Sequence, residues 1–117
     1  KVNPGDLAKI AAGDPGFFKE MILLYFKTSE NSLKTLEKAV AEKNWEEVTE
    51  TAHKMAAPSK HLNAEVLYKK LKRLENISET SPDENKINEL FSSIKLETSE
   101  VIESLKAFLT DWEMKQN

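Results

Sequence analysis

Of cysteine and histidine, two residue types that often act as nucleophiles or bind transition metals, this sequence contains only histidine. The 117 residues contain no cysteine and two histidines, His53 and His61. The lack of cysteine excludes disulfides, thiolate metal sites and cysteine nucleophiles. An imidazole, by contrast, can serve near neutral pH as a nucleophile, a proton shuttle or a metal ligand. The two histidines are therefore the first candidates for a reactive centre.

His53 is predicted to stand on the flank of an amphipathic helix. The stripe of this helix, spaced in steps of three and four, is Trp45, Val48, Ala52, Met55, Ser59 and Leu62. At 100° per residue the centre of the stripe lies about 130° from His53, so the imidazole should face solvent. Ala57 and Lys60 follow on the same side, where a small residue leaves room for a partner and an ammonium could meet an anion. A surface histidine without a role also fits this position, and His61 is expected to be one.

Other segments predict the helices that would hold His53 in place. A short first helix is expected over Asp6–Ala12. Gly13-Asp14-Pro15 then predicts a stop and the start of a second helix that runs to about Lys43. Asn44-Trp45-Glu46-Glu47 resembles a capping box for the third helix, and Asn63 is expected at its end because asparagine tolerates the left-handed conformation.

The remaining sequence predicts two more helices and the fold class. The fourth helix is predicted from the stripe Leu67, Leu71, Leu74 and Ile77. Ser81 is expected to cap a long last helix from about Asp83 to Glu113. Short connections between long amphipathic helices predict an all-α fold, an antiparallel up-down-up-down four-helix bundle with a short extra N-terminal helix. Residues 1–117 are expected to form a single domain.

Composition limits the partners and the location of this domain. The net charge of −3 argues against nucleic-acid binding. No apolar run approaches the roughly 20 residues that span a bilayer, and no secretory signal is present, so the domain itself is expected in the cytoplasm without direct membrane contact. Between Lys54 and Arg73, six basic residues and one acid suggest a partner with a small anionic site, although a solvated helix face explains the same run.

The residues around His53 also resemble a known family. Thr51-Ala52-His53-Lys54-Met55-Ala56-Ala57, Leu62-Asn63-Ala64, and then Leu67, Leu71, Leu74 and Glu75 are similar to the histidine-containing phosphotransfer (HPt) domain of bacterial phosphorelays. The likeness covers nearly the whole chain, including Gly13-Asp14 and the helix entry at Trp45. It implies that Nε2 of His53 accepts a phosphoryl group from the phosphoaspartate of a receiver domain and passes it to another receiver. It implies too that Glu75 hydrogen-bonds the imidazole and fixes its tautomer and orientation.

The same resemblance implies what the domain binds and what it lacks. Its partners would be response-regulator receiver domains, which bring the Mg²⁺, so the domain itself needs no cofactor, has no ATP site and is not an enzyme alone. We expect the isolated domain to be monomeric. The docking surface is expected to include Ala56, Ala57, His61, Leu7 and Ile10. Because the chain starts at Lys1 without methionine, we expect a piece of a longer protein, such as the cytoplasmic end of a membrane-anchored hybrid sensor kinase.

Four positions depart from the family pattern, and one of them, Asn63 in place of the turn glycine, is a benign change. The family usually has lysine and glycine where this chain has Ala56 and Ala57, so the usual partner of the phosphoryl charge is missing. Lys60 or Lys54 is expected to replace it, with Lys60 better placed on the face of the helix. Pro58 lies inside the helix and is expected to kink it.

Three other classes of protein compete with this interpretation. A histidine kinase hairpin also has proline five residues after its histidine, but it needs an acidic residue where Lys54 stands, and no glycine-rich nucleotide pocket is present. Glu50-x-x-His53 matches the ligand pair of di-iron bundles, but a second pair is missing. A helical interaction module that has lost phosphotransfer remains, because Ala56 replaces the usual lysine.

Overall fold

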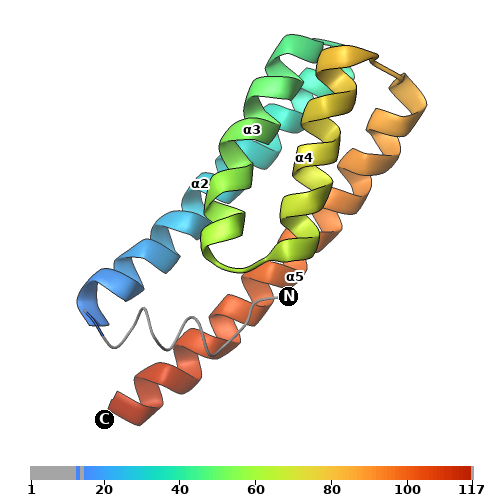
Figure 1. Ribbon diagram of the computed structural model, residues 1–117. Helices are drawn as coiled ribbons and strands as arrows, with labels where there is room; N and C mark the ends of the chain where they lie inside the picture. The colour runs from blue at the N-terminus through green and yellow to red at the C-terminus, as the bar shows by residue number, and fades with distance from the viewer. Residues whose placement is uncertain (1–12, 14, 117) are drawn as a thin grey trace.

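The computed structural model describes residue 13 and residues 15–116, and this part of the chain is all-helical. Figure 1 shows four helices packed side by side: α2 (Pro15–Ala41), α3 (Trp45–His61), α4 (Glu65–Thr80) and α5 (Glu84–Gln116). The all-α class is therefore confirmed. The expected first helix, with the docking residues Leu7 and Ile10, lies outside the described residues.

The connections on either side of α3 follow the predicted chemistry. The Asn44 side chain accepts a hydrogen bond from the Glu47 backbone N–H at 3.2 Å, which confirms the asparagine cap. Asn63 has a φ of 58° and lies two residues after His61, the last residue of α3, which confirms the predicted break. Its N–H donates to the Lys60 carbonyl and the Ala64 N–H donates to the Ser59 carbonyl, the two bonds of a Schellman motif. These bonds satisfy the last carbonyls of α3, so the helix ends at a defined residue.

The prediction that Ser81 caps the last helix is wrong. Asp83 takes that role, because its carboxylate accepts from the Lys86 backbone N–H at 3.1 Å and α5 begins at the next residue. Ser81 instead follows the end of α4, where its N–H donates to the Ile77 carbonyl. A carboxylate at a helix N-terminus both accepts a hydrogen bond and meets the positive end of the helix dipole. The aspartate therefore suits the position better than the serine two residues earlier.

The hydrophobic core runs along the inside of all four helices. Neighbouring contacts join α2 with α3, α3 with α4, α4 with α5, and α2 with α5. The largest fully buried side chains are Phe18, Ile22, Leu36, Val48, Leu67, Leu71, Leu74, Ile87, Ile94, Val101 and Leu105. At one end the Phe18 ring packs on Phe108 and Trp112, with ring centroids 5.8 and 5.4 Å apart. The predicted apolar stripes therefore become the core.

Pro58 lies within α3, and the helix continues past it to His61. The expected kink at this position stays a prediction. Within the described part of the chain, no helix combines the length and the apolar character needed to cross a membrane.

Candidate functional site

His53 lies on α3 with its side chain 68% exposed. The residue before it, Ala52, is fully buried, and Val48 and Ala56, four residues to either side of Ala52, are buried too. Val48, Ala52 and Ala56 form a row along α3 that faces the core. His53 follows Ala52 in the sequence and therefore lies beside this row, at its edge. The imidazole is therefore open to a visiting molecule, as the helix periodicity predicts.

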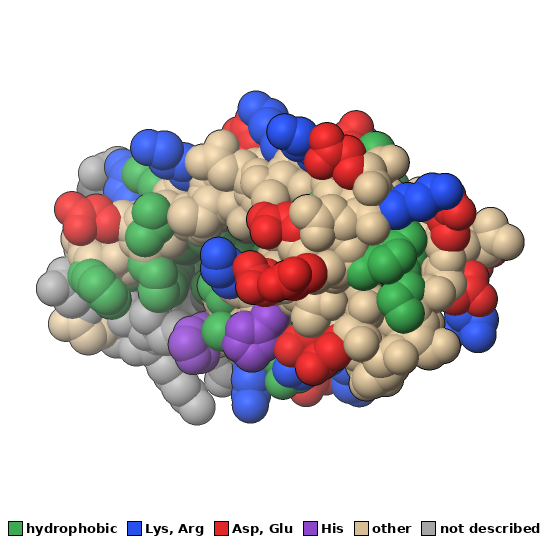
Figure 2. All heavy atoms as spheres, turned by 90° about the horizontal axis from the view of Figure 1, so that it is seen from above, with side chains coloured by type: hydrophobic (Ala, Val, Ile, Leu, Met, Phe, Trp, Pro, Cys, Tyr) green, Lys and Arg blue, Asp and Glu red, His purple; other side chains and the backbone are tan. Residues whose placement is uncertain are grey.

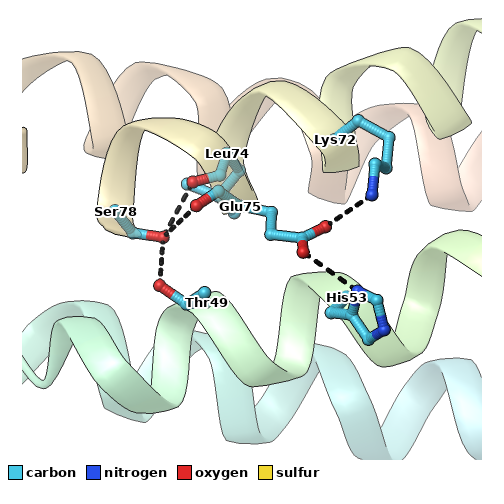
Figure 3. Close-up of polar contacts among 6 residues, drawn as sticks. All are labelled: Thr49, His53, Lys72, Leu74, Glu75 and Ser78. Carbon is cyan, nitrogen blue, oxygen red and sulfur yellow. Dashed lines mark hydrogen bonds and ion pairs between the residues drawn. The ribbon is translucent and has the colours of Figure 1, made fainter. Parts of the chain in front are cut away.

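Glu75 of α4 meets the imidazole from the neighbouring helix. Its Oε2 lies 2.9 Å from Nδ1 of His53, and the side chain is only 17% exposed (Figure 3). Glu75 follows the fully buried Leu74, so it emerges at the seam between α3 and α4. The structure thus brings together two residues that are 22 positions apart in the sequence.

The ionisation of Glu75 decides which imidazole nitrogen carries the proton. Partial burial would raise the pKa of Glu75, but hydrogen bonds from Lys72 and His53, together with their charges, outweigh burial and hold the pKa below its usual value. An ionised carboxylate can only accept hydrogen bonds. Nδ1 must therefore donate, so in the neutral imidazole the lone pair lies on Nε2. Among the described residues nothing hydrogen-bonds Nε2, so this nitrogen is free to attack an electrophile.

Lys72 completes the cluster, although the sequence analysis did not single it out. Its Nζ lies 2.9 Å from Oε1 of Glu75, so the two carboxylate oxygens have different partners (Figure 3). The same hydrogen bond raises the pKa of Lys72. A lysine three residues before a glutamate on a helix is a known pairing distance, and this spacing could have indicated the contact.

A pair of hydroxyl groups fixes the two helices beside the cluster. Thr49 Oγ1 and Ser78 Oγ lie 2.7 Å apart across the α3–α4 seam, and each also lies 2.8 Å from a carbonyl of its own helix. Because each hydroxyl has one proton, one of them donates across the seam and the other donates to its own helix. Thr49 precedes His53 by one turn, and Ser78 follows Glu75 by three residues. The hydroxyl pair therefore adds a polar contact between the two helices close to the His53–Glu75 contact.

Ser78→Ala is expected to destabilise the domain by about 1 kcal/mol, because Ser78 is buried and loses its hydrogen bond across the seam. The melting temperature should fall by about 4 °C. Thr80→Ala is the matched control, since Thr80 is exposed and bonds only the Asn76 carbonyl of its own helix. Thermal melts of the two variants make the comparison. An equal effect of both would show that the hydroxyl pair does not stabilise the seam.

The two lysines expected to meet an anion lie elsewhere. The Nζ of Lys60 lies 5.7 Å from the centre of the Tyr68 ring, a cation–π distance. Lys54 and His61 line a groove of about 500 Å³ between α2 and α3. In the described part of the chain, neither lysine pairs with His53 or Glu75. A role for either lysine in phosphotransfer stays a prediction.

The prediction that Ala56 belongs to the docking surface is wrong, because this residue is only 4% exposed. Ala56 continues the buried row of Val48 and Ala52 at a spacing of four residues. Ala57, the next residue, is exposed, as expected for a small residue beside the imidazole. The position where the resemblance implies lysine is therefore part of the core in this chain.

The comparisons with known proteins identify no relative. No family model matches the sequence, and no curated protein and no solved structure is significantly similar to it. The function must therefore be argued from the site itself.

The surface around the site combines charged and apolar side chains. Figure 2 shows the two histidine side chains exposed on the same face, with acidic, basic and apolar side chains close by in that view. Among the residues that the structure describes, no group of three histidine, aspartate or glutamate side chains could hold a metal ion. A free lone pair on Nε2 of His53 could act as a nucleophile or as a proton acceptor.

Proposed function

We propose that this chain is a phosphocarrier of the HPt type, in which His53 accepts a phosphoryl group from the phosphoaspartate of one receiver domain and passes it to another. The observation that supports this most is the 2.9 Å contact between Nδ1 of the exposed His53 and Glu75, which in the neutral imidazole leaves the lone pair on Nε2. A histidine without a role would not need a largely covered carboxylate to hold one of its ring nitrogens.

The transfer step follows from this arrangement. Nε2 attacks the phosphorus, the new P–N bond forms, and the bond between phosphorus and the aspartate oxygen breaks. The aspartate leaves as a carboxylate, and the imidazole keeps its Nδ1 proton and becomes cationic. Glu75 accepts a hydrogen bond from that N–H throughout, so it stabilises the positive charge that develops on the ring. Attack by a second receiver's aspartate on the phosphohistidine reverses the same step.

In this proposal the receiver supplies the groups that bind the phosphoryl oxygens. Its Mg²⁺ and its aspartate pocket neutralise the phosphoryl charge, so the chain needs no cofactor or ATP site. We propose that the receiver docks across α3 beside Ala57, and that the groove between α2 and α3 extends this surface. Leu24 lines the groove and is 60% exposed, which suits an apolar contact with a partner.

The framework and setting belong to the same proposal. We place the helices in an antiparallel up-down-up-down bundle, with a short N-terminal helix before α2 that adds Leu7 and Ile10 to the docking surface. The isolated domain is monomeric and cytoplasmic, and it forms part of a hybrid sensor kinase.

Receiver domains carrying a labelled phosphoaspartate test the proposal directly. Incubated with one of a panel of such receivers, the chain should take up the label in a form that resists alkali and is lost in acid, as expected for a phosphorus–nitrogen bond. Incubation with labelled ATP alone should leave the chain unlabelled. Uptake from ATP would instead support a kinase hairpin.

A second candidate function is an interaction module that has lost phosphotransfer. Two observations favour it: Ala56 is buried where the family has lysine, and the basic side chains Lys54 and Lys60 point to a groove and to an aromatic ring. In that case a receiver would bind without transferring its label. Binding measured together with labelling separates the two functions.

A further inference from the structure

We infer that Lys72 is a positioning residue for phosphotransfer at His53 and that it acts through Glu75. The inference rests on the proposed function. It starts from the way Glu75 divides its two oxygens: Oε2 faces Nδ1 of His53 and Oε1 faces Nζ of Lys72, each at 2.9 Å (Figure 3). No other charged side chain of the described residues pairs with Glu75.

The first consequence of the contact concerns geometry. A glutamate side chain has three rotatable bonds, and a single hydrogen bond to an exposed imidazole holds it weakly. The second bond, to Lys72 on the same helix, restricts the carboxylate to the orientation in which Oε2 points across the seam. The imidazole is then held with Nε2 directed outward, where the phosphorus arrives.

The second consequence concerns charge. An ionised Glu75 helps the ring, which becomes cationic as the P–N bond forms and the aspartate oxygen leaves. The same carboxylate repels the incoming phosphoryl group, which carries negative charge. Because Oε2 touches Nδ1, the ring responds mainly to the carboxylate, whereas the phosphoryl group on the far side of the ring meets the carboxylate and the ammonium together. Lys72 thus cancels the repulsion and leaves the useful hydrogen bond in place.

In the structure Lys72 reaches the imidazole only through Glu75. Its Nζ pairs with Oε1 of Glu75, whereas Oε2 is the oxygen that contacts Nδ1 of His53. The side chain of Lys72 remains 44% exposed, so replacing it should not disturb the core. Its effect should therefore depend on the charge of Glu75.

Phosphoramidate, a small donor that phosphorylates imidazoles, tests this dependence without a receiver. The rate at which His53 gains phosphorus is measured by mass spectrometry in four proteins: the original chain, Lys72→Met, Glu75→Gln and the double variant. Lys72→Met should slow phosphorylation about three- to fivefold, the range expected for an exposed ion pair. In the Glu75→Gln background the same change should alter the rate less than about twofold, since no charge remains to be cancelled.

Two further variants exclude a merely structural role. Lys72→Arg should be phosphorylated at about the rate of the original chain, because arginine can donate to the same oxygen of Glu75. Lys69→Met, which removes one positive charge from the same helix, should leave the rate unchanged. An equal loss in both Glu75 backgrounds would overturn the inference, since Lys72 would then act on the phosphoryl group itself. An unchanged rate in Lys72→Met would also overturn it.

The proposed relay function and the proposed role of Lys72 can be contradicted separately. If phosphoramidate labels His53 but no phosphorylated receiver does, the proposed relay function is wrong while the Lys72 comparison still stands or falls by its own rates. If His53 of the original chain gains no phosphorus from either source, both proposals are wrong.

Discussion

His53→Gln is expected to abolish uptake of the phosphoryl group from a labelled receiver, a loss of at least about a thousandfold in rate, because the substitution removes the nucleophilic nitrogen. Helical content and melting temperature should change little. The side chain is 68% exposed, and glutamine can still form a hydrogen bond at the seam. Labelling kinetics, circular dichroism and a thermal melt of the purified variant provide the measurement.

His61→Gln is the matched control for this prediction. His61 is also exposed on α3, but among the described residues no carboxylate pairs with it. Its replacement should leave the label on His53. Because His61 lines the proposed docking groove, any effect on the rate should disappear at a saturating concentration of the receiver. Normal labelling of His53→Gln, or loss of labelling in His61→Gln, would move the site from one histidine to the other.

Glu75→Ala should slow transfer about ten- to a hundredfold without unfolding the domain, because the imidazole loses the group that fixes its tautomer and orientation. Glu75→Gln should fall between the alanine variant and the original chain. The glutamine carbonyl can still accept from Nδ1–H, but it carries no charge to stabilise the cationic ring. Single-turnover rates with one labelled receiver rank the three proteins. Equal rates in all three would remove Glu75 from the mechanism.

The stability of the original chain relative to Glu75→Gln is expected to depend on pH. Because the pKa of folded Glu75 lies below its unfolded value, ionised Glu75 stabilises the folded chain. This contribution is complete above the unfolded pKa, about 4.3, and is lost as the pH falls through the lower folded pKa. Urea melts should therefore show Glu75→Gln less stable than the original chain at pH 7, and this difference should shrink as the pH falls below about 4.3. A constant difference across this range would contradict the assignment.

The helices could be predicted from the sequence because their signals are local. Apolar spacing, the Asn44 cap and the left-handed Asn63 each depend on a few neighbouring residues, and the structure reproduces them. The start of α5 was harder, because Ser81 and Asp83 are both good caps and the choice depends on how the chain leaves α4. Local patterns thus predict that a helix exists more securely than they predict its first residue.

The site was predictable only in part, for a physical reason. The exposure of His53 follows from helix periodicity alone. The resemblance pointed to Glu75, whereas the contact with Lys72 depends on the rotamer of a long side chain. The apolar stripe of the third helix, in alternating steps of three and four, passes from Ala52 to Met55 and so leaves out Ala56. A step of four from Val48 to Ala52 and again to Ala56 gives the buried row that the structure shows.

The contact between the Thr49 and Ser78 hydroxyls could not be predicted for a related reason. Thr49 and Ser78 lie 29 residues apart, and nothing in either neighbourhood indicates that the two hydroxyls meet. Their contact depends on the relative shift of α3 and α4, which the packing of the whole interface decides. Contacts between helices therefore need the structure, even when both helices are predicted well.

The position of the phosphorus on the imidazole tests the central claim most directly. After labelling from a phosphorylated receiver, ¹⁵N and ³¹P spectra of the histidine-labelled chain show which nitrogen is bonded to phosphorus. We predict a phosphorus–nitrogen coupling to Nε2 of His53, with Nδ1 still protonated beside Glu75. Phosphorus on Nδ1 of His53, or on His61, would contradict the account.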